Sequence, residues 1–250
     1  MNSSIPSIPY LYSQILPMNF KDKVVLITGA TSGIGEACAE VFGREGAKIA
    51  ISGRNPQKLE QTIIKLRSKN IKVLPILADA GSEADNQRMA EETLAHYGRI
   101  DILINNAGIS MRALFQDLDL DVFRKVMDTN FWGSVYATKF CLPAILESKG
   151  SIIGISSING YRGTPARTAY TASKYAMNGF FEALRTEVMK KGVHVLVVAP
   201  GFTASNIRNT ALTADGSSQG ESPRDESKMM TSEEVAEHIL KATLKRKRDI

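Results

Sequence analysis

Three side chains in the second half of the chain have the types and spacing needed to move a proton. Tyr170 and Lys174 lie four residues apart in a segment compatible with a helix, and Ser157 lies thirteen residues before the tyrosine. Residues four apart share a helix face, so the lysine would lie beside a phenol whose ordinary pKa of about 10 is too high for a base at neutral pH. A cation about 4 to 5 Å away would lower that pKa by roughly three units. The spacing predicts proton exchange with a substrate, and a chance pair on a surface helix is the alternative.

A glycine-rich segment near the start of the chain predicts a phosphate-binding turn. The apolar run 23–28 leads into Gly29-Ala30-Thr31-Ser32-Gly33-Ile34-Gly35, and a helical pattern follows. Glycines let the backbone approach a pyrophosphate, and the free amides and positive dipole of a helix N-terminus attract its negative charge. An ordinary tight turn is the alternative, but three glycines between a strand and a helix favour nucleotide binding.

The residues after the second expected strand predict which cofactor is used. Enzymes that prefer NAD usually carry a carboxylate there, which binds the ribose 2′-hydroxyl and repels a 2′-phosphate. This chain has Gly53 followed by Arg54. Gly53 is expected to leave room for a 2′-phosphate, and Arg54 to hold it with two charge-assisted hydrogen bonds, so NADP(H) is the expected cofactor. The alternative is a solvated Arg54, or one paired with Glu60.

Strands and helices must position these residues, and the chain alternates between the two. Strand-like runs occupy 23–28, 47–52, 71–78, 100–105, 150–156 and 193–199. Helix-like runs occupy 33–44, 56–69, 82–97, 119–147, 168–190 and 232–247. This alternation predicts an α/β fold, a Rossmann-type doubly wound parallel sheet in a single domain, with ligands at the carboxyl ends of the strands.

Two segments fall outside this alternation. Residues 1–19 contain three prolines and no basic start, so they resemble neither a signal peptide nor a membrane span and are expected to form a flexible arm before a domain at 20–250. Residues 203–231 are rich in Ser, Thr, Asn and Gly and follow a strand end, so they are expected to form a mobile substrate lid. An idle surface loop would have the same composition.

Composition limits the classes of function. The chain has 250 residues, of which 43% are hydrophobic and 23% charged, as in an ordinary globular protein. Its net charge of +5 is scattered without interleaved aromatic residues, which argues against nucleic-acid binding. The basic run 245–248 predicts a solvated helix end, with contact to acidic lipid as the alternative. Two buried reduced cysteines, Cys38 and Cys141, fit a cytoplasmic protein, and three scattered histidines give a metal site no support.

With these motifs in order, the chain resembles the short-chain dehydrogenase/reductase family over about residues 20–247. The glycine turn resembles the family's cofactor turn, and Asn105-Asn106-Ala107-Gly108 resembles its strand-four motif. Asn130 matches its helix asparagine, Ser157 with Tyr170 and Lys174 its active site, and Pro200-Gly201 its last cofactor loop. The resemblance implies an oxidoreductase that interconverts a carbonyl and an alcohol through hydride transfer.

The resemblance also implies roles for individual residues. Tyr170 would act as general acid/base, Ser157 would hold the substrate oxygen, Lys174 would bind the nicotinamide ribose, and Asn130 would hold a water for proton supply. Asp79 lies where family members contact adenine, while Asn106 to Gly108 would pass beneath a ribose. The full set expected to bind the cofactor is Gly29, Thr31, Ser32, Gly33, Ile34, Gly35, Arg54, Asp79, Ala80, Asn106, Ala107, Gly108, Tyr170, Lys174, Pro200, Gly201 and Thr203.

The family further implies a small-molecule carbonyl or alcohol substrate and a homodimer or homotetramer. Members usually continue past the final helix into a seventh strand, whereas this sequence ends at Ile250, shortly after Lys245-Arg246-Lys247-Arg248. A sensor or scaffold that binds the cofactor without turnover is the alternative function, although it would not need a positioned proton donor. The residues expected around the substrate include 109–115, 158–165 and the 203–231 loop. They are mixed apolar and polar, which indicates a medium-sized, partly hydrophobic compound.

Overall fold

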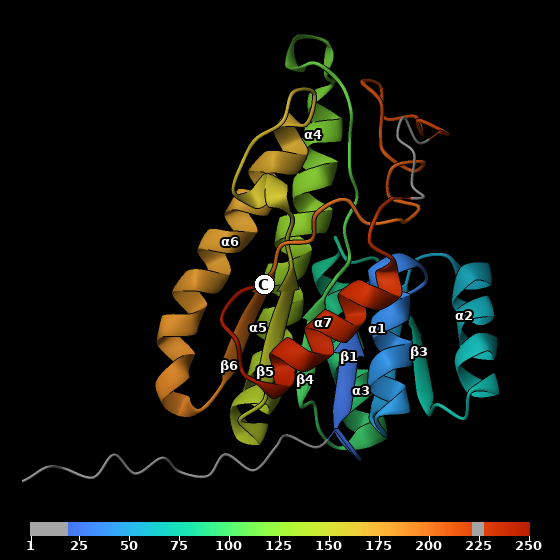
Figure 1. The fold of residues 1–250 in the computed structure, drawn as a ribbon, viewed down its shortest axis with the longest axis vertical. Helices are drawn as coiled ribbons and strands as arrows, with labels where there is room; N and C mark the ends of the chain where they lie inside the picture. Colours follow the sequence, from blue (N-terminus) through green and yellow to red (C-terminus); the bar gives the residue numbers. More distant parts are fainter. Residues whose placement is uncertain (1–19, 222–227) are drawn as a thin grey trace, which may run out of the picture.

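The computed structural model describes residues 20–221 and 228–250, so the expected arm at 1–19 and part of the expected lid lie outside the described residues. Its centre is one parallel sheet of six strands in the order β3-β2-β1-β4-β5-β6 (Figure 1). The strands are β1 (Val24–Ile27), β2 (Lys48–Gly53), β3 (Val73–Leu77), β4 (Ile102–Asn105), β5 (Ser151–Ile155) and β6 (His194–Val198). The doubly wound order reverses between β1 and β4, where the carboxyl ends of such sheets bind ligands.

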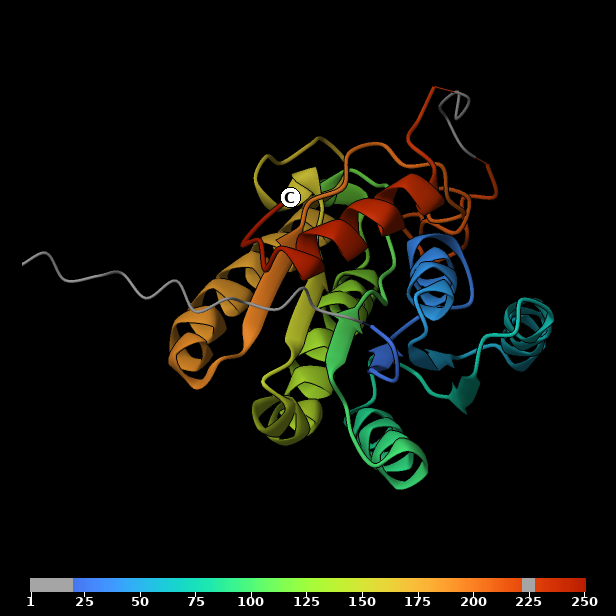
Figure 2. The same ribbon diagram turned by 60° about the horizontal axis from the view of Figure 1, so that its bottom comes forward.

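Helices cover both faces of the sheet (Figure 2). The helices are α1 (Gly33–Arg44), α2 (Pro56–Ser68), α3 (Glu83–Tyr97), α4 (Leu120–Met127), α5 (Gly133–Ser148), α6 (Thr168–Val188) and α7 (Ser232–Leu244). Alternate residues of each strand point to opposite faces, so Ile27 packs with α1, α2 and α7 while Leu26 packs with α3, α5 and α6. Both faces are therefore buried, which explains why the strands are continuous apolar runs.

The predicted α/β fold is confirmed, with strand bounds that differ from prediction by at most two residues. The expected helical run over 119–147 is confirmed in its extent, since the chain is helical from Leu120 to Ser148. Within it a π-helical turn that was not expected, η2 (Asp128–Trp132), separates α4 from α5 and contains Asn130. Such turns within helices occur frequently at functional sites.

Beyond α7 the chain returns to the sheet. The Val197 N–H donates to the Arg248 carbonyl at 3.0 Å, and the Ala199 N–H donates to the Ile250 carbonyl at 2.8 Å. A parallel bridge joins Val197 to Asp249. Residues 248–250 thus lie along the outer edge of β6, so the chain pairs with the sheet after its final helix, although the sequence was expected to end without the family's usual seventh strand.

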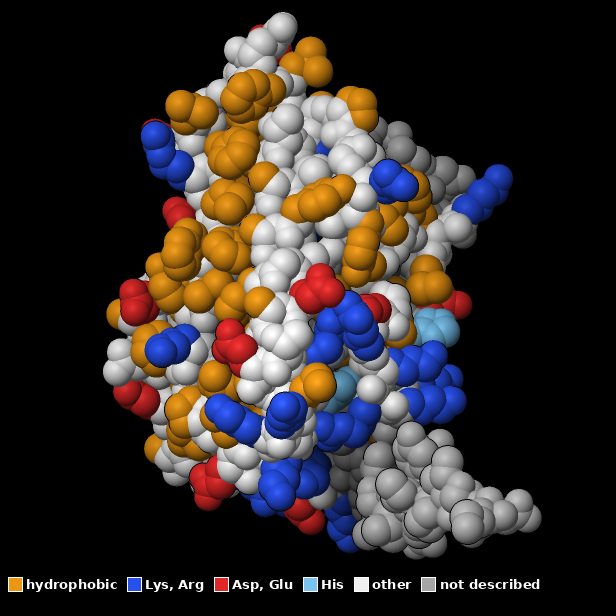
Figure 3. Space-filling model, turned by 90° about the vertical axis from the view of Figure 1, so that its left-hand side faces the viewer, with side chains coloured by type: hydrophobic (Ala, Val, Ile, Leu, Met, Phe, Trp, Pro, Cys, Tyr) orange, Lys and Arg blue, Asp and Glu red, His pale blue; other side chains and the backbone are white. Residues whose placement is uncertain are grey.

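The described surface is uneven in hydrophobicity. Hydrophobic side chains gather on the side of the molecule where α6 lies (Figure 3). Phe131 and Trp132 of η2 contact Phe180 of α6 and Tyr136 of α5 respectively through their rings, and Trp132 is 43% exposed. Cys38 and Cys141 are buried and unpaired in the core, as predicted. No helix among the described residues has the length and apolarity to cross a bilayer.

Candidate active site

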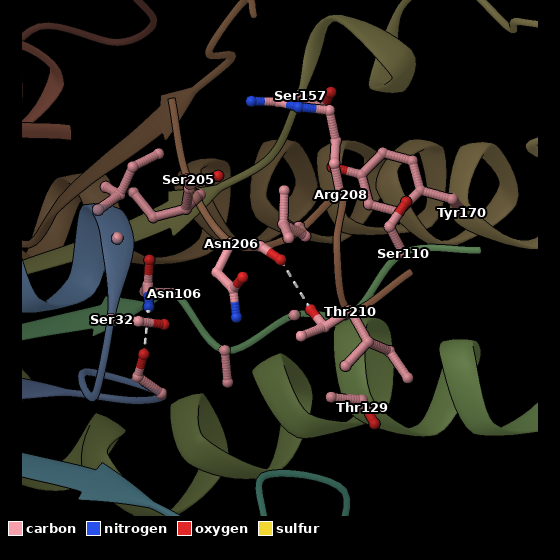
Figure 4. A pocket seen from close by; sticks show the side chains of 18 of the residues that line it. Ser32, Asn106, Ser110, Thr129, Ser157, Tyr170, Ser205, Asn206, Arg208 and Thr210 are labelled. Atoms are coloured by element: carbon pink, nitrogen blue, oxygen red, sulfur yellow. Dashed lines mark hydrogen bonds between the residues drawn. The ribbon is translucent and has the colours of Figure 1, made fainter. Parts of the chain in front are cut away.

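A cavity of about 960 Å³ opens at the carboxyl ends of the strands. Loops that follow β1, β2, β3, β4, β5 and β6 all contribute to its walls. In Figure 4, Ser32 and Asn106 lie on one side of the pocket, whereas Ser110, Ser157, Tyr170 and Arg208 lie together on the other. The cavity therefore has a half beside the glycine turn and a half beside the candidate proton-transfer group.

The glycine turn begins with a residue whose backbone packs closely against the loop after β4. Gly29 has a φ of +62°, and a Cβ there would lie 2.7 Å from the Ala107 Cα, so no larger residue fits without displacement. Ser32 precedes α1 without a side-chain capping bond, which leaves the first amides of this helix available at the cavity. Free amides at a helix N-terminus suit a pyrophosphate. The residues present thus fit a dinucleotide.

Packing against the glycine turn requires a glycine at position 53, which the sequence interpretation did not foresee. A Cβ at this position would lie 2.4 Å from the Thr31 methyl carbon, so the glycine is required by contact with the glycine turn. That Gly53 also leaves room for a 2′-phosphate stays a prediction. The same contact excludes an acidic side chain at this position unless Thr31 moves.

Arg54 is exposed and lines the cavity, and the expected alternative pairing with Glu60 is not among the ion pairs of the described residues. Lys58, one turn into α2, lines the same part of the cavity, and its backbone N–H donates to the Asn55 side chain at 2.8 Å. Two cations thus lie beyond the carboxyl end of β2. The sequence interpretation missed Lys58, although its position four residues after Arg54 was available as a signal.

Asp79 and Ala80 line the cavity after β3. The Asp79 carboxylate accepts from the Gly81 N–H at 2.9 Å, and Ser82 rather than Asp79 caps α3. Asn106 connects β4 to the glycine turn, because its amide donates to the carbonyls of Thr28 and Gly29, both at 2.9 Å. Asn106 therefore fixes the conformation of the glycine turn, and its expected place beneath a ribose stays a prediction.

The structure brings the three candidate proton-transfer residues together. Ser157 ends the stretch after β5, accepts from the Asn159 N–H at 3.1 Å and is hydrogen-bonded to the Tyr170 side chain. Lys174 Nζ lies 5.8 Å from the centre of the Tyr170 ring. It donates to the Ile155 carbonyl at 2.8 Å. One wall of the cavity thus carries a phenol, a hydroxyl and an amine.

The electrostatics differ from the sequence prediction. Burial raises the pKa of Tyr170, and the hydrogen bond with Ser157 and the charge of Arg167 only partly oppose this. Burial also lowers the pKa of Lys174 to about 7, so this side chain is only partly charged at neutral pH. The prediction that Lys174 lowers the tyrosine pKa is therefore wrong, because the amine is itself desolvated and directed at a backbone carbonyl.

Asn130 is fully buried in the π-helical turn. Its side-chain oxygen accepts from the Ile109 N–H at 2.8 Å, and its amide donates to the Ile109 carbonyl at 2.9 Å and to Ser173 Oγ at 3.0 Å. These bonds join η2 to the loop after β4 and to α6. The asparagine side chain therefore fixes the backbone beside Gly108, and the expected water-holding role stays a prediction.

The expected lid begins at the cavity. Pro200, Gly201 and Thr203 line it, and Thr203 is buried. Further along, the Arg112 N–H donates to the Leu212 carbonyl at 2.8 Å, and the Leu212 N–H donates to the Ser110 carbonyl at 2.9 Å. This part of the segment is tied to the loop after β4. Residues 222–227 lie outside the described residues, and lid motion stays a prediction.

Four further residues lie in the half beside Tyr170. Three of them fall within the segments 109–115 and 203–231 that were expected to shape the substrate pocket, namely Ser110, Arg112 and Arg208, whereas the sequence interpretation missed Arg167. Ser110 is buried and accepts a short hydrogen bond from Arg167, which lies just before α6. Arg112 and Arg208 also line the cavity. The signal was present in three arginines close to predicted ligand loops, but their convergence depends on the tertiary fold.

Comparisons with known proteins agree on one family. The family model described as short chain dehydrogenase matches residues 23–215. Dehydrogenase/reductase SDR family member 7B of Mus musculus is 41% identical over 238 residues, which cover 92% of this chain and 73% of that protein. 11-beta-hydroxysteroid dehydrogenase 1A of Arabidopsis thaliana is 39% identical over 201 residues, 79% of this chain and 57% of that protein.

A solved structure shares the fold. A short chain dehydrogenase/reductase of Burkholderia phymatum in complex with NAD superposes with a TM-score of 0.85 at 23% identity, covering 93% of this chain and 89% of its own. This agreement is with the whole described architecture rather than with one motif.

Proposed function

Because this chain belongs to the short chain dehydrogenase family, and is thus an oxidoreductase of small molecules, we propose that it is an NADP(H)-dependent enzyme that interconverts a carbonyl and an alcohol. One observation carries the proposal. The cavity that fits a dinucleotide at the glycine turn carries Tyr170, hydrogen-bonded to Ser157, on its other side. A module that only bound the cofactor would not need a proton donor at this place.

The proposed roles follow from the chemistry of each group. The bound nicotinamide supplies or accepts the hydride. Tyr170 donates the proton to the carbonyl oxygen, and Ser157 donates a second hydrogen bond that orients this oxygen. Asn130 holds the loop beside Gly108 in place through Ile109, so that Lys174 and the loop keep their relative positions.

At neutral pH Tyr170 is expected to be in the protonated form that carbonyl reduction needs. Carbonyl reduction needs a protonated Tyr170, and burial raises the pKa of this residue, so the neutral phenol is the dominant form. Alcohol oxidation needs the phenolate, which the same burial disfavours. We therefore expect oxidation to gain more from alkaline conditions than reduction does.

The NADP preference rests on the cations after β2. Arg54 and Lys58 both line the half of the cavity beside the glycine turn, and Thr31 blocks an acidic side chain at position 53. An arginine fork and an ammonium suit a phosphate monoester, and the lack of a carboxylate removes repulsion. The relative from Burkholderia phymatum, whose structure holds NAD, is too distant to decide this choice.

We also propose that the protein self-associates as a dimer or tetramer. Trp132 is 43% exposed and stacks on Tyr136, and Tyr175 of α6 is 47% exposed. Exposed aromatic clusters of this kind are enriched in interfaces between proteins.

The function is tested by following NADPH consumption with a panel of ketones. Wild type should reduce at least one, and Tyr170→Phe should lower kcat by about 100-fold or more, since a general acid contributes 10² to 10⁴. The NADPH dissociation constant should change little, because the ring remains. The proposed role of Tyr170 would be wrong if the Phe variant kept more than about a tenth of wild-type kcat.

A further inference from the structure

Positive charge is in excess in the cavity. Among the described residues that line it Asp79 is the one acidic residue, and six are basic, namely Arg54, Lys58, Arg112, Arg167, Lys174 and Arg208. Arg54 and Lys58 follow β2, in the half where the cofactor phosphates are proposed to bind. Arg112, Arg167 and Arg208 come from loops after β4, β5 and β6, on the other side of the switch point. Cofactor phosphates at the glycine turn do not account for these three arginines.

Arg167 is the most closely held of the three. It immediately precedes α6 and is partly buried, and its guanidinium donates to the buried Ser110 hydroxyl at the cavity wall. It lies close enough to Tyr170 for its charge to act on the phenol. A ligand group that contacts this guanidinium would therefore lie near the proton donor. Ser110 would offer that group a second polar contact.

Arg112 lies two residues after Ser110 and is exposed at the cavity. Among the described residues no carboxylate forms an ion pair with it. Its backbone is fixed by the hydrogen bond to Leu212, so the side chain is anchored at its base. An exposed arginine with a fixed backbone, next to a partly buried one, suits an anion that enters from solvent.

Arg208 completes the group from the segment after β6. It is only 8% exposed, and its guanidinium donates to the Thr203 carbonyl at 2.8 Å. Figure 4 shows it on the same side of the pocket as Ser110, Ser157 and Tyr170. Its guanidinium adds a third positive charge to this half of the cavity.

We infer that the half of the cavity beside Tyr170 binds an anionic group of the substrate, so the substrate is a ketone that carries a carboxylate or phosphate. Arg112 and Arg167 hold this group, and Arg208 lies in the same half of the cavity. This inference rests on the proposed function, since it concerns the same reaction. Planar guanidinium groups bind both anions in a bidentate manner, so the two sources share one chemistry.

The experiment compares matched ketones with NADPH as the second substrate. Levulinate is measured against its methyl ester, and hydroxyacetone phosphate against hydroxyacetone. In wild type, kcat/KM for at least one anionic member should exceed that for its neutral partner by about tenfold or more, as expected for a charge-assisted contact. A preference for levulinate would show that the site binds a carboxylate, and a preference for hydroxyacetone phosphate would show that it binds a phosphate.

Two variants and one control test the residues. Arg112→Glu and Arg167→Gln should each lower the anionic-to-neutral ratio by about tenfold, and raising the salt concentration should lower the wild-type ratio. Arg44→Gln removes one charge on α1, far along the chain from these loops, and should keep the wild-type ratio. Arg112 is exposed, so its variant should fold even if Arg167→Gln does not, which circular dichroism would show.

The outcomes separate the two proposals. If wild type consumes NADPH with neutral ketones and shows no preference for either anionic partner, the proposed function stands and the anion site is wrong. The anion site is also wrong if the preference is unchanged in every folded variant. If no ketone is reduced at all, the proposed function fails and the anion site falls with it.

Discussion

Burial of Lys174 opposes the effect on the tyrosine pKa that its spacing from Tyr170 predicts. Four residues after Tyr170, it would lower the tyrosine pKa if it were a solvated ammonium. In the structure it is 3% exposed and its own pKa is lowered to about 7. The residue that is proposed to support catalysis therefore costs stability whenever it is charged in the folded protein.

Lys174→Met should stabilise the folded protein at pH 7. The folded pKa lies below the unfolded value of about 10.4, so between these values the unfolded chain binds more protons, and wild-type stability rises with pH. The gain from Met should be about 3 kcal/mol or more at pH 7 and should approach zero above pH 10. Urea denaturation at several pH values measures it. A gain that does not shrink with rising pH would mean that desolvated charge is not its source.

Arg54 is the residue at which cofactor choice is tested. A bidentate contact to a phosphate contributes roughly 1.5 to 3 kcal/mol, so wild type should prefer NADPH over NADH by about tenfold or more in kcat/KM. Arg54→Ala should lose most of this preference, and Arg54→Ala with Lys58→Ala should lose the rest. Arg88→Ala, which removes an exposed arginine of α3, is the matched control. Equal use of both cofactors by wild type would contradict the assignment.

At the scale of elements, the loop after β1 and the end of β2 are in close contact at the cofactor site. Gly53 ends β2 and Thr31 belongs to the glycine turn after β1, and the missing Cβ of the first makes room for the methyl group of the second. Adjacent parallel strands bring these loops together, because β1 and β2 pair in register. The identity of residue 53 is thus set by packing between loops as well as by cofactor chemistry.

Gly53→Ala should therefore destabilise the protein by about 1 to 3 kcal/mol, as overpacking usually does. Thr31→Ser removes the methyl group and should relieve most of this loss, which gives a coupling energy of about 0.5 kcal/mol or more in a double-mutant cycle. Urea denaturation of the four proteins measures it. Additive effects would show that the contact is not what requires glycine.

The strands and most helices could be predicted because the pattern of apolar residues within each segment indicates which of its side chains are buried. Residues 24–27 form a continuous apolar run, as a strand buried on both faces requires. The π-helical turn at Asn130 could not be predicted, because it depends on bonds to Ile109, which is 21 residues away. The glycine turn and Ser157, Tyr170 and Lys174 were recognisable by spacing, whereas Ser110, Arg112 and Arg167 meet only through tertiary folding.

At the scale of the whole molecule, hydrophobic side chains gather on the side where α6 lies (Figure 3). Trp132 joins this surface to the catalytic machinery, since it lies two residues after Asn130 in the same π-helical turn. A partner that packs on Trp132 would therefore also restrain the turn that positions the loop beside Gly108. Self-association and activity are expected to be linked through η2.

Trp132→Glu should weaken self-association by tenfold or more in dissociation constant and lower kcat/KM in parallel, because the charge would be buried at the interface without a partner. Ile64→Glu is the matched control, since Ile64 is 60% exposed on α2, on the opposite face of the sheet, and should change neither quantity. Analytical ultracentrifugation over a range of concentrations measures the first, and NADPH consumption the second. A wild-type protein that stays monomeric at every concentration would rule out the interface, and an unchanged kcat/KM in a dissociated Trp132→Glu would rule out its link to the active site.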